Sequence, residues 1–135
     1  MLSKKEIIKI FIEWIRVKIK LHFSDVNKDV YFREGQIWWT NIGQNVGVEI
    51  NGKNHNFERP ALVLKKFNEQ SLWILPITSV IKNGKYYYNF INNGEDNYVN
   101  ISQLRSISSK RLIRKLGNIS QFEFDSLRDK VRNII

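Results

Sequence analysis

The sequence predicts an α+β fold in which a small, strongly bent antiparallel sheet, close to a β-barrel, carries helices on its outside. Three observations lead to this fold class. A chain of 135 residues suits one domain, and 42% apolar content with 13% aromatic content is enough for a core. Several short runs of aromatic and β-branched residues are separated by turn residues, as strands are. The chain also has amphipathic segments at both ends, each opening on Ser-x-x-Glu.

The first element is a basic amphipathic helix over residues 3–23. Its apolar residues recur at helical spacing, and Ser3 with Glu6 forms a possible capping box. The main face is expected to contain Ile7, Phe11, Trp14, Ile15, Lys18 and Leu21, widened by Ile8, Ile12 and Ile19. Such a helix can lie on a membrane. Its broad aromatic face instead favours packing on its own domain or on a partner subunit.

The central elements are strands. Residues 24–34 are a polar linker, and 35–42 read as the first strand, followed by a long loop over 43–57. Strands are then expected at 59–66, 71–77, 85–91, 98–101 and 104–107, with a turn at 92–96. The short link at 66–70 predicts that the first two of these pair as a hairpin. We therefore expect residues 1–34 to form a helix and linker, and residues 35–135 to form the barrel domain.

The chain ends in mixed structure. Residues 108–112 predict a brief helical turn, and 113–119 a last strand. Ser120 and Glu123 form a second capping box, which opens a helix that runs to about Asn133. Phe124, Leu127 and Val131 have the spacing of its apolar face.

Composition limits the function. There are 22 Lys and Arg residues against 13 Asp and Glu, a net charge of +9, which favours an anionic partner. The chain has no cysteine and only two histidines, so we expect no metal site and no cofactor. Charges interrupt every apolar stretch, which argues against a signal sequence or a membrane span and makes the cytoplasm the expected location.

The two prolines of the chain lie beside its most informative polar residues. Pro60 follows Arg59 at the start of one apolar run, and Pro76 precedes Thr78 and Ser79 at the end of the next. Proline favours extended geometry in the residue before it and cannot donate a ladder hydrogen bond. We therefore expect the second strand to loosen near Pro76. If the two strands are neighbours, a guanidinium and two hydroxyls meet at one rim, which suits a phosphate.

Six pieces of the sequence, in order, give a resemblance to a known family. They are Gly35-Gln36-Ile37-Trp38-Trp39, Asn45-Val46-Gly47-Val48-Glu49, Arg59-Pro60-Ala61-Leu62-Val63-Leu64, Leu75-Pro76-Ile77-Thr78-Ser79, Ile101-Ser102-Gln103-Leu104-Arg105-Ser106-Ile107 and, after the turn at Lys110-Arg111-Leu112, Leu116-Gly117-Asn118-Ile119. From about residue 33 to the end, the chain resembles the MazF/PemK toxins. The helix at 3–23 precedes the usual start of that family and is an added element.

The resemblance implies an SH3-like barrel, a homodimer, and metal-independent endoribonuclease activity on single-stranded RNA. It also implies a cognate acidic antitoxin as a partner. In this family's RNA cleavage a ribose 2′-hydroxyl attacks the adjacent phosphorus. Arg59 is suited to stabilise the crowded oxyanion, because its planar fork matches phosphate oxygens and stays charged. Thr78 can donate a hydrogen bond to a phosphoryl oxygen.

The general base is harder to assign. Glu49 aligns with a family glutamate and is the best candidate, although it can instead position Arg59. A carboxylate base works best with a raised pKa, and a nearby arginine has the opposite effect. The Arg and Asp of PemK-type members are replaced here by Asn100 and Ser102. His55, in the loop before Arg59, is a further acid or base candidate.

RNA recognition is expected around the same rim. Amide and hydroxyl groups read the edges of unpaired bases. The candidates are Gln44, Asn45, Gly47, Ser79, Ser102 and Gln103. Trp38 or Trp39 can stack a base, but in an alternating strand one of them faces the core.

Two other functions remain open at this stage. One is a non-catalytic SH3-like module that binds RNA or an acidic protein. The other is a topoisomerase poison of the CcdB type, which shares the barrel. We expect the latter least, since its activity is tied to a C-terminal Trp-Gly-Ile and this chain ends Asn133-Ile134-Ile135.

Overall fold

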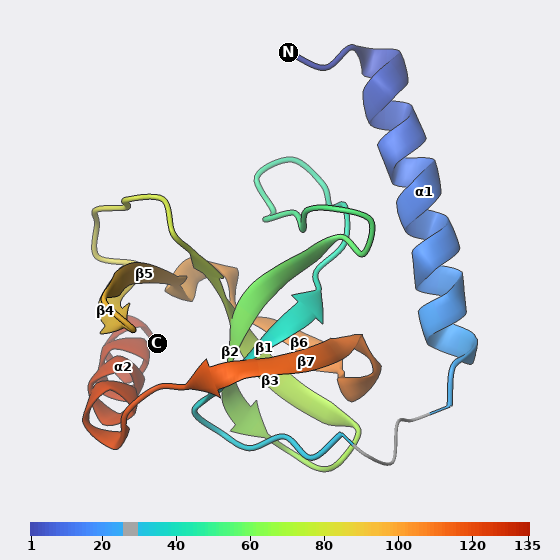
Figure 1. The fold of residues 1–135 in the computed structure, drawn as a ribbon. Coiled ribbons are helices and arrows are strands. Elements are labelled where there is room, and N and C mark those ends of the chain that lie inside the picture. Colours follow the sequence, from blue (N-terminus) through green and yellow to red (C-terminus); the bar gives the residue numbers. More distant parts are fainter. Residues whose placement is uncertain (26–29) are drawn as a thin grey trace.

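The computed structural model describes residues 1–25 and 30–135, so residues 26–29 of the predicted linker lie outside the described residues. The described residues form seven strands, two α-helices and two short 3-10 helices (Figure 1). In chain order these are α1 (Lys4–Phe23), β1 (Gln36–Asn41), β2 (Glu58–Lys66), β3 (Ser71–Thr78), β4 (Tyr87–Asn92), β5 (Glu95–Asn100), η1 (Ile101–Gln103), β6 (Arg105–Ser108), η2 (Ser109–Arg111), β7 (Leu112–Asn118) and α2 (Gln121–Ile134). The predicted fold class is confirmed.

One bent antiparallel sheet contains all these strands. Its order is β4-β5-β3-β2-β1-β7, and β6 pairs with β3 off this path. The predicted hairpin is present, because β2 pairs with β3 in the register Ala61 opposite Pro76 and Leu62 opposite Leu75. The central strand β3 therefore has β2 along one edge and two different strands along the other.

The expectation that the second strand loosens near Pro76 holds on one edge only: the ladder with β2 ends at Ala61 opposite Pro76, but the other edge of β3 stays paired. β3 continues through Pro76 to Thr78. Along its other edge, β3 pairs with β6 as far as Ile74 and with β5 from Ile77 onward. Pro76 lies where β3 passes from one partner strand to the next, so its missing N–H leaves no ladder bond unmade. The proline permits a corner of the barrel instead of ending the strand.

The core consists of two clusters on the two faces of this sheet. Leu62, Leu75 and Val99 pack with Phe124 and Leu127 of α2. Ala61, Val63 and Ile74 pack with Trp38 and other residues in the second cluster. Successive residues of β2 thus point into different clusters, which explains why Ala61–Leu64 is an uninterrupted apolar run rather than an alternating one.

Both helices begin at the predicted serines. The Ser3 hydroxyl accepts a hydrogen bond from the Glu6 N–H, and the Ser120 hydroxyl accepts one from the Glu123 N–H. Each bond satisfies one of the N–H groups that the first turn of a helix leaves without a partner. No helix in the described part of the chain is long and apolar enough to cross a membrane.

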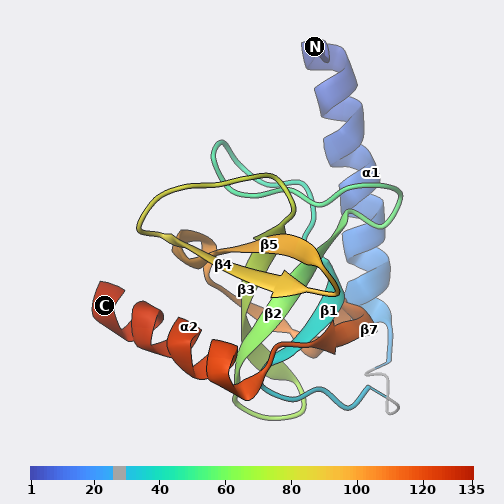
Figure 2. The same cartoon turned by 60° about the vertical axis from the view of Figure 1, so that its left-hand side comes forward.

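Helix α1 contacts the barrel mainly through Trp14, the one buried side chain of this helix. The indole packs against the Phe57 ring, with centroids 5.5 Å apart, and the Arg111 guanidinium lies 5.6 Å from its ring. Figures 1 and 2 show α1 along one side of the barrel, with its N-terminal turns beyond the end of the sheet. Of the two predicted alternatives, packing on its own domain or on a partner subunit, the structure shows the first. The predicted packing face is wrong in part, because Ile7, Ile15 and Lys18 are exposed.

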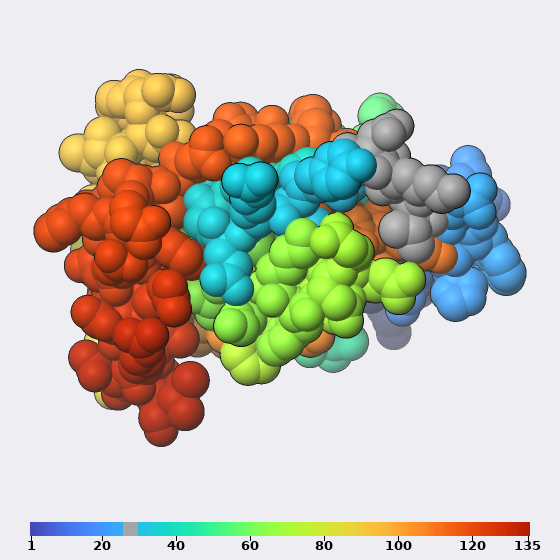
Figure 3. Space-filling model, turned by 90° about the horizontal axis from the view of Figure 1, so that it is seen from below, coloured from blue at the N-terminus to red at the C-terminus, as the bar shows by residue number. Residues whose placement is uncertain are grey.

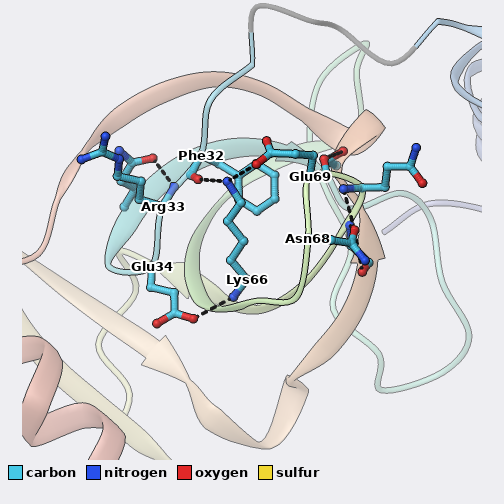
Figure 4. A network of polar contacts seen from close by, with 10 residues as sticks. Phe32, Arg33, Glu34, Lys66, Asn68 and Glu69 are labelled. Atoms are coloured by element: carbon cyan, nitrogen blue, oxygen red, sulfur yellow. Dashed lines mark hydrogen bonds and ion pairs between the residues drawn. The ribbon is translucent and has the colours of Figure 1, made fainter.

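The end of the barrel seen in Figure 3 lies opposite the N-terminus and is closed by the β2–β3 turn, with α2 on one side and α1 on the other. At this end, Lys66 connects the segment before β1 with the β2–β3 turn (Figure 4). Its backbone N–H donates to Glu34, and its ammonium donates to the Phe32 carbonyl at 2.9 Å and pairs with Glu69 at 3.0 Å. The two long loops, over residues 42–57 and 79–86, lie at the other end.

Candidate active site

Two long loops lie at the same end of the barrel, over residues 42–57 and 79–86 (Figure 1). The antiparallel order explains this placement, because β2 begins where β3 ends. The ladder ends at Ala61 opposite Pro76, and the same register continued by two residues places Arg59 opposite Thr78. The structure thus brings together the two residues that the prolines singled out.

Arg59 and Thr78 line one hollow of about 330 Å³ between the two loops. Its other lining residues are Val48, Ile50, Lys53, Val80, Lys82, Tyr87, Asn100 and Gln103. The described lining thus includes three cationic side chains and no carboxylate. Such a hollow suits an anion, with Arg59 as its most buried cation.

Arg59 is oriented by the loop before it. Its Nε donates a 2.9 Å hydrogen bond to the Asn51 carbonyl, which leaves the two terminal amino groups for a ligand. Burial lowers the pKa of Arg59, but an arginine remains charged at any physiological pH. Within residues 1–25 and 30–135 it has no ion-pair partner, since the neighbouring Glu58 pairs with Arg114 at 3.2 Å.

Thr78 is the last residue of β3 and is half-buried. Its Oγ1 accepts a 3.2 Å hydrogen bond from the Val80 N–H, which leaves the hydroxyl hydrogen for another acceptor. Ser79 follows it and is exposed, outside the lining of the Arg59 hollow.

Glu49 lies in a second hollow of about 420 Å³, next to the first. Ile50 and Gln103 line both hollows. The Glu49 carboxylate accepts a 3.0 Å hydrogen bond from the Val46 N–H. Burial lowers the pKa of Arg105, and the charge of Glu49 opposes that shift. The cation that Glu49 influences is therefore Arg105.

Gln103 joins the 42–57 loop to η1. Its Oε1 accepts from the Ile50 N–H at 3.0 Å, and its Nε2 donates to the Val48 carbonyl at 3.2 Å. Beside it, the Ser102 hydroxyl donates to Asn100 at 2.9 Å. Both predicted RNA-binding residues of η1 therefore lie at the hollows, where Gln103 also fixes the loop.

The remaining recognition candidates are spread over the loop. The Asn45 amide donates to the Ile42 and Ile50 carbonyls, so it closes the loop from inside. Gly47 has a φ of 57° and open space around it, so the backbone is accessible there. Gln44 lines a separate hollow together with His55.

The tryptophans follow the predicted alternation. Trp38 is buried in the barrel, and its indole N–H donates to Gln36. Trp39 is half-buried, with the Arg114 guanidinium 4.9 Å from its ring.

Sequence reasoning missed several side chains at this end. Lys53, Lys82 and Tyr87 line the Arg59 hollow, but no local pattern distinguishes them from other loop residues. Arg105 and Arg111 donate to the carbonyls of Ile42 and Asn41, at the start of the loop. Both belong to the pieces that carried the family resemblance. Burial, followed by the charge of Arg105, lowers the pKa of Arg111.

Comparison with known protein families assigns the barrel residues to a family. The family described as PemK-like, MazF-like toxin of type II toxin–antitoxin system matches residues 33–135. The chain belongs to this family. The match begins where the resemblance was expected to begin, and it leaves α1 outside.

Solved structures of MazF-like toxins share the fold. MazF from Deinococcus radiodurans is 22% identical with a TM-score of 0.65, and the alignment covers 78% of this chain and 97% of that one. The MazE–MazF complex from the same organism is 19% identical with a TM-score of 0.60, covering 78% and 96%. An endoribonuclease in complex with its cognate antitoxin from a mycobacterial species is 11% identical with a TM-score of 0.57, covering 76% and 93%. Comparison with curated protein sequences gives no significant match.

Proposed function

We propose that this toxin-family protein is an endoribonuclease that cleaves single-stranded RNA without a metal ion. The observation that carries the proposal is the hollow in which Arg59, Thr78 and two lysines meet with no carboxylate in the described lining. A phosphodiester that enters it encounters a preoriented guanidinium and a free hydroxyl hydrogen. The endoribonuclease found among the structural neighbours supports the same activity.

The proposed step is an in-line attack of the ribose 2′-oxygen on the adjacent phosphorus. The bond from phosphorus to the 5′-oxygen breaks, which gives a 2′,3′-cyclic phosphate and a 5′-hydroxyl. The 2′-hydroxyl loses a proton and the leaving 5′-oxygen gains one. Arg59 stabilises the charge on the equatorial oxygens, and Thr78 donates a hydrogen bond to one of them.

Glu49 remains the candidate for the proton acceptor. Its place in the adjoining hollow requires the ribose to extend across Gln103, which lines both hollows. We propose that Lys53 and Lys82 hold flanking phosphates. Base contacts are assigned to Gln44, Asn45, Gly47, Ser79, Ser102 and Gln103. The antitoxin complexes among the neighbours support an acidic antitoxin as partner. We further propose that the protein acts as a homodimer in the cytoplasm.

The test is cleavage of single-stranded RNA of varied sequence in the presence of EDTA. Arg59→Ala should lower the cleavage rate by about 10²–10³-fold, as expected when one transition-state donor is lost. Arg59→Lys should recover only part of the rate, because an ammonium cannot reproduce the planar fork. Arg132→Ala is the matched control, since Arg132 is an exposed arginine on α2 that pairs with Asp129. Intact RNA with the wild-type protein, or cleavage unchanged by Arg59→Ala, would reject the proposal.

A second candidate function is RNA binding without cleavage. It is favoured by one observation, that neither a carboxylate nor an imidazole belongs to the described lining of the Arg59 hollow. This alternative predicts salt-sensitive binding with no product, and the same Arg59 variants distinguish the two functions.

A further inference from the structure

Helix α1 has apolar residues on two opposite faces. Ile10, Trp14, Val17 and Leu21 are buried or half-buried on the side of the barrel. Ile8, Ile12, Ile15 and Ile19 are 50%, 46%, 52% and 53% exposed. Both sets have four-three-four spacing and are offset by two residues, which on an α-helix is a rotation of about 200°. The second set, named here the isoleucine seam, therefore lies on the face of α1 opposite the first set.

The spacing of the isoleucine seam specifies what it can bind. Positions separated by four, three and four residues are the a and d positions of a coiled coil. Apart from Ile7 and the ends of the helix, the exposed apolar residues of α1 lie at a and d, a stripe narrower than the wide apolar face of a helix that lies on a lipid surface. Ile12 and Ile19 are at a, and Ile8 and Ile15 are at d. The seam thus has the geometry of a surface that packs against another helix.

The charges beside the seam specify the chemistry of that helix. In this register Lys9 and Arg16 occupy e positions, while Lys4, Phe11 and Lys18 occupy g positions, so four of these five flanking residues are cationic. Arg16 also contacts Glu13 at 3.0 Å, but both side chains are largely exposed, which makes that pair weak. Residues at e and g face the partner helix and set partner choice.

A second copy of α1 fits this surface poorly. An antiparallel pair places e against e and g against g, and a parallel pair places e against g. Either arrangement brings cationic side chains together across the seam, at a cost in free energy. Glutamate or aspartate at the facing positions converts the same contacts into attraction.

We propose that the isoleucine seam binds an acidic amphipathic helix of a partner protein, with apolar residues at a and d and carboxylates at e and g. Trp14 anchors the opposite face of α1 to the barrel, which holds the seam outward. The N-terminal turns extend beyond the sheet and leave the seam accessible there (Figures 1 and 2).

Cationic side chains also lie near the C-terminal end of the isoleucine seam. Ile19 also lines a hollow of about 460 Å³ between α1 and η2, where Lys18, Lys110 and Arg111 are the charged lining residues. An acidic helix that follows the seam therefore meets further cations at this end. The isoleucine seam itself lies outside residues 33–135, and its proposed binding role does not depend on RNA cleavage.

The experiment uses the full chain and two synthetic helical peptides of about three heptads each. Both have leucine at a and d, and they differ only in carrying glutamate or lysine at e and g. Fluorescence anisotropy with labelled peptide should show at least tenfold tighter binding of the glutamate peptide at low salt, with the difference narrowing as salt is added.

The double variant Ile12→Ala and Ile15→Ala removes apolar area while keeping charge and helix propensity. It should weaken binding of the glutamate peptide by at least tenfold. Ile91→Ala is the matched control, because Ile91 is exposed on β4 and far from α1 in sequence. Circular dichroism checks that α1 stays folded in each variant, and hydrogen exchange of the α1 amides checks that it stays docked.

Three outcomes overturn the proposal. They are equal binding of the two peptides, no binding of either, and binding that the double variant does not weaken. Light scattering and vesicle flotation identify the true occupant in those cases. Self-association lost in the double variant assigns the seam to a second copy. Seam-dependent binding to phosphatidylserine vesicles, with no peptide binding, assigns it to a lipid surface.

Discussion

Gly43 is the position where one added methyl group should release α1 from the barrel. Its φ is 95°, a conformation that residues with a side chain rarely adopt. A Cβ built there lies 2.4 Å from Cζ2 and 2.5 Å from Cε2 of Trp14. These atoms belong to a rigid ring, so in Gly43→Ala the whole indole must move by about 1 Å to reach an ordinary contact.

The expected free-energy cost of Gly43→Ala has two parts. The positive φ alone costs about 1–2 kcal/mol with a side chain present. A tryptophan buries about 150–250 Å², which at about 25 cal/mol per Å² is worth about 4–6 kcal/mol when fully lost. We expect Gly43→Ala to forfeit roughly half of the Trp14 contact, so that docking of α1 weakens by about 2–3 kcal/mol beyond the backbone cost.

The assay is native-state hydrogen exchange of the α1 amides, with denaturant unfolding measured alongside. Gly94→Ala is the matched control, because Gly94 has a φ of 79° and nothing within 4 Å of its Cβ position. In a Trp14→Ala background the cost of Gly43→Ala should fall to the backbone cost, a coupling of about 2 kcal/mol or more. Equal exchange of α1 in Gly43→Ala and Gly94→Ala, or coupling below about 0.5 kcal/mol, would refute the reasoning.

Three further predictions concern the loop, the core and pH. Gln103→Leu should change the free energy of unfolding by no more than about 2 kcal/mol, since two neutral hydrogen bonds are lost. The same variant should speed amide exchange at Ile50 and slow RNA cleavage. Unchanged exchange at Ile50 would count against the role of Gln103 in fixing the loop. Leu127→Ala should lower the free energy of unfolding by about 2–5 kcal/mol in a denaturant titration, because Leu127 is completely buried, and a loss below about 1 kcal/mol would contradict this packing. Burial, and then the hydrogen bond to Glu123, raises the pKa of Tyr88, so the folded state holds the phenol proton more tightly than the unfolded chain does. This contribution to stability is complete below the ordinary pKa of about 10 and is lost as pH rises through the folded-state pKa, so Tyr88→Phe should flatten the decline in melting temperature above about pH 10.

The pairing of Arg59 with Thr78 was predictable because short-range features determine it. The link at 66–70 is too short for anything but a hairpin, and an antiparallel hairpin brings the start of one strand to the end of the next. The role of Pro76 was not predictable in the same way. It depends on where β3 passes from β6 to β5, which is a property of strands that follow much later in the chain.

The surroundings of Arg59 depend on long-range contacts. Lys53 and Lys82 come from loops whose paths no local pattern specifies. Gln103 holds the loop that carries Glu49 from more than fifty residues away. Glu49 consequently lines the adjoining hollow together with Arg105, although its sequence position beside the loop glycine suggested a place near Arg59.

The sequence by itself indicated the family, and it determined the β2–β3 hairpin, the two helix starts at Ser3 and Ser120, and the two residues that meet at the rim of this hairpin. The last three depend on residues a few positions apart, where periodicity, capping and turn chemistry operate. Only the tertiary structure decided the order of the strands in the sheet, the hollow that Glu49 lines, the cations around Arg59, and which apolar face of α1 is covered. Docking of Trp14 against Gly43 and Phe57 buries one face and exposes the isoleucine seam. That choice is made by packing between distant segments, because a helix with two apolar faces contains no local signal for which face will find a partner.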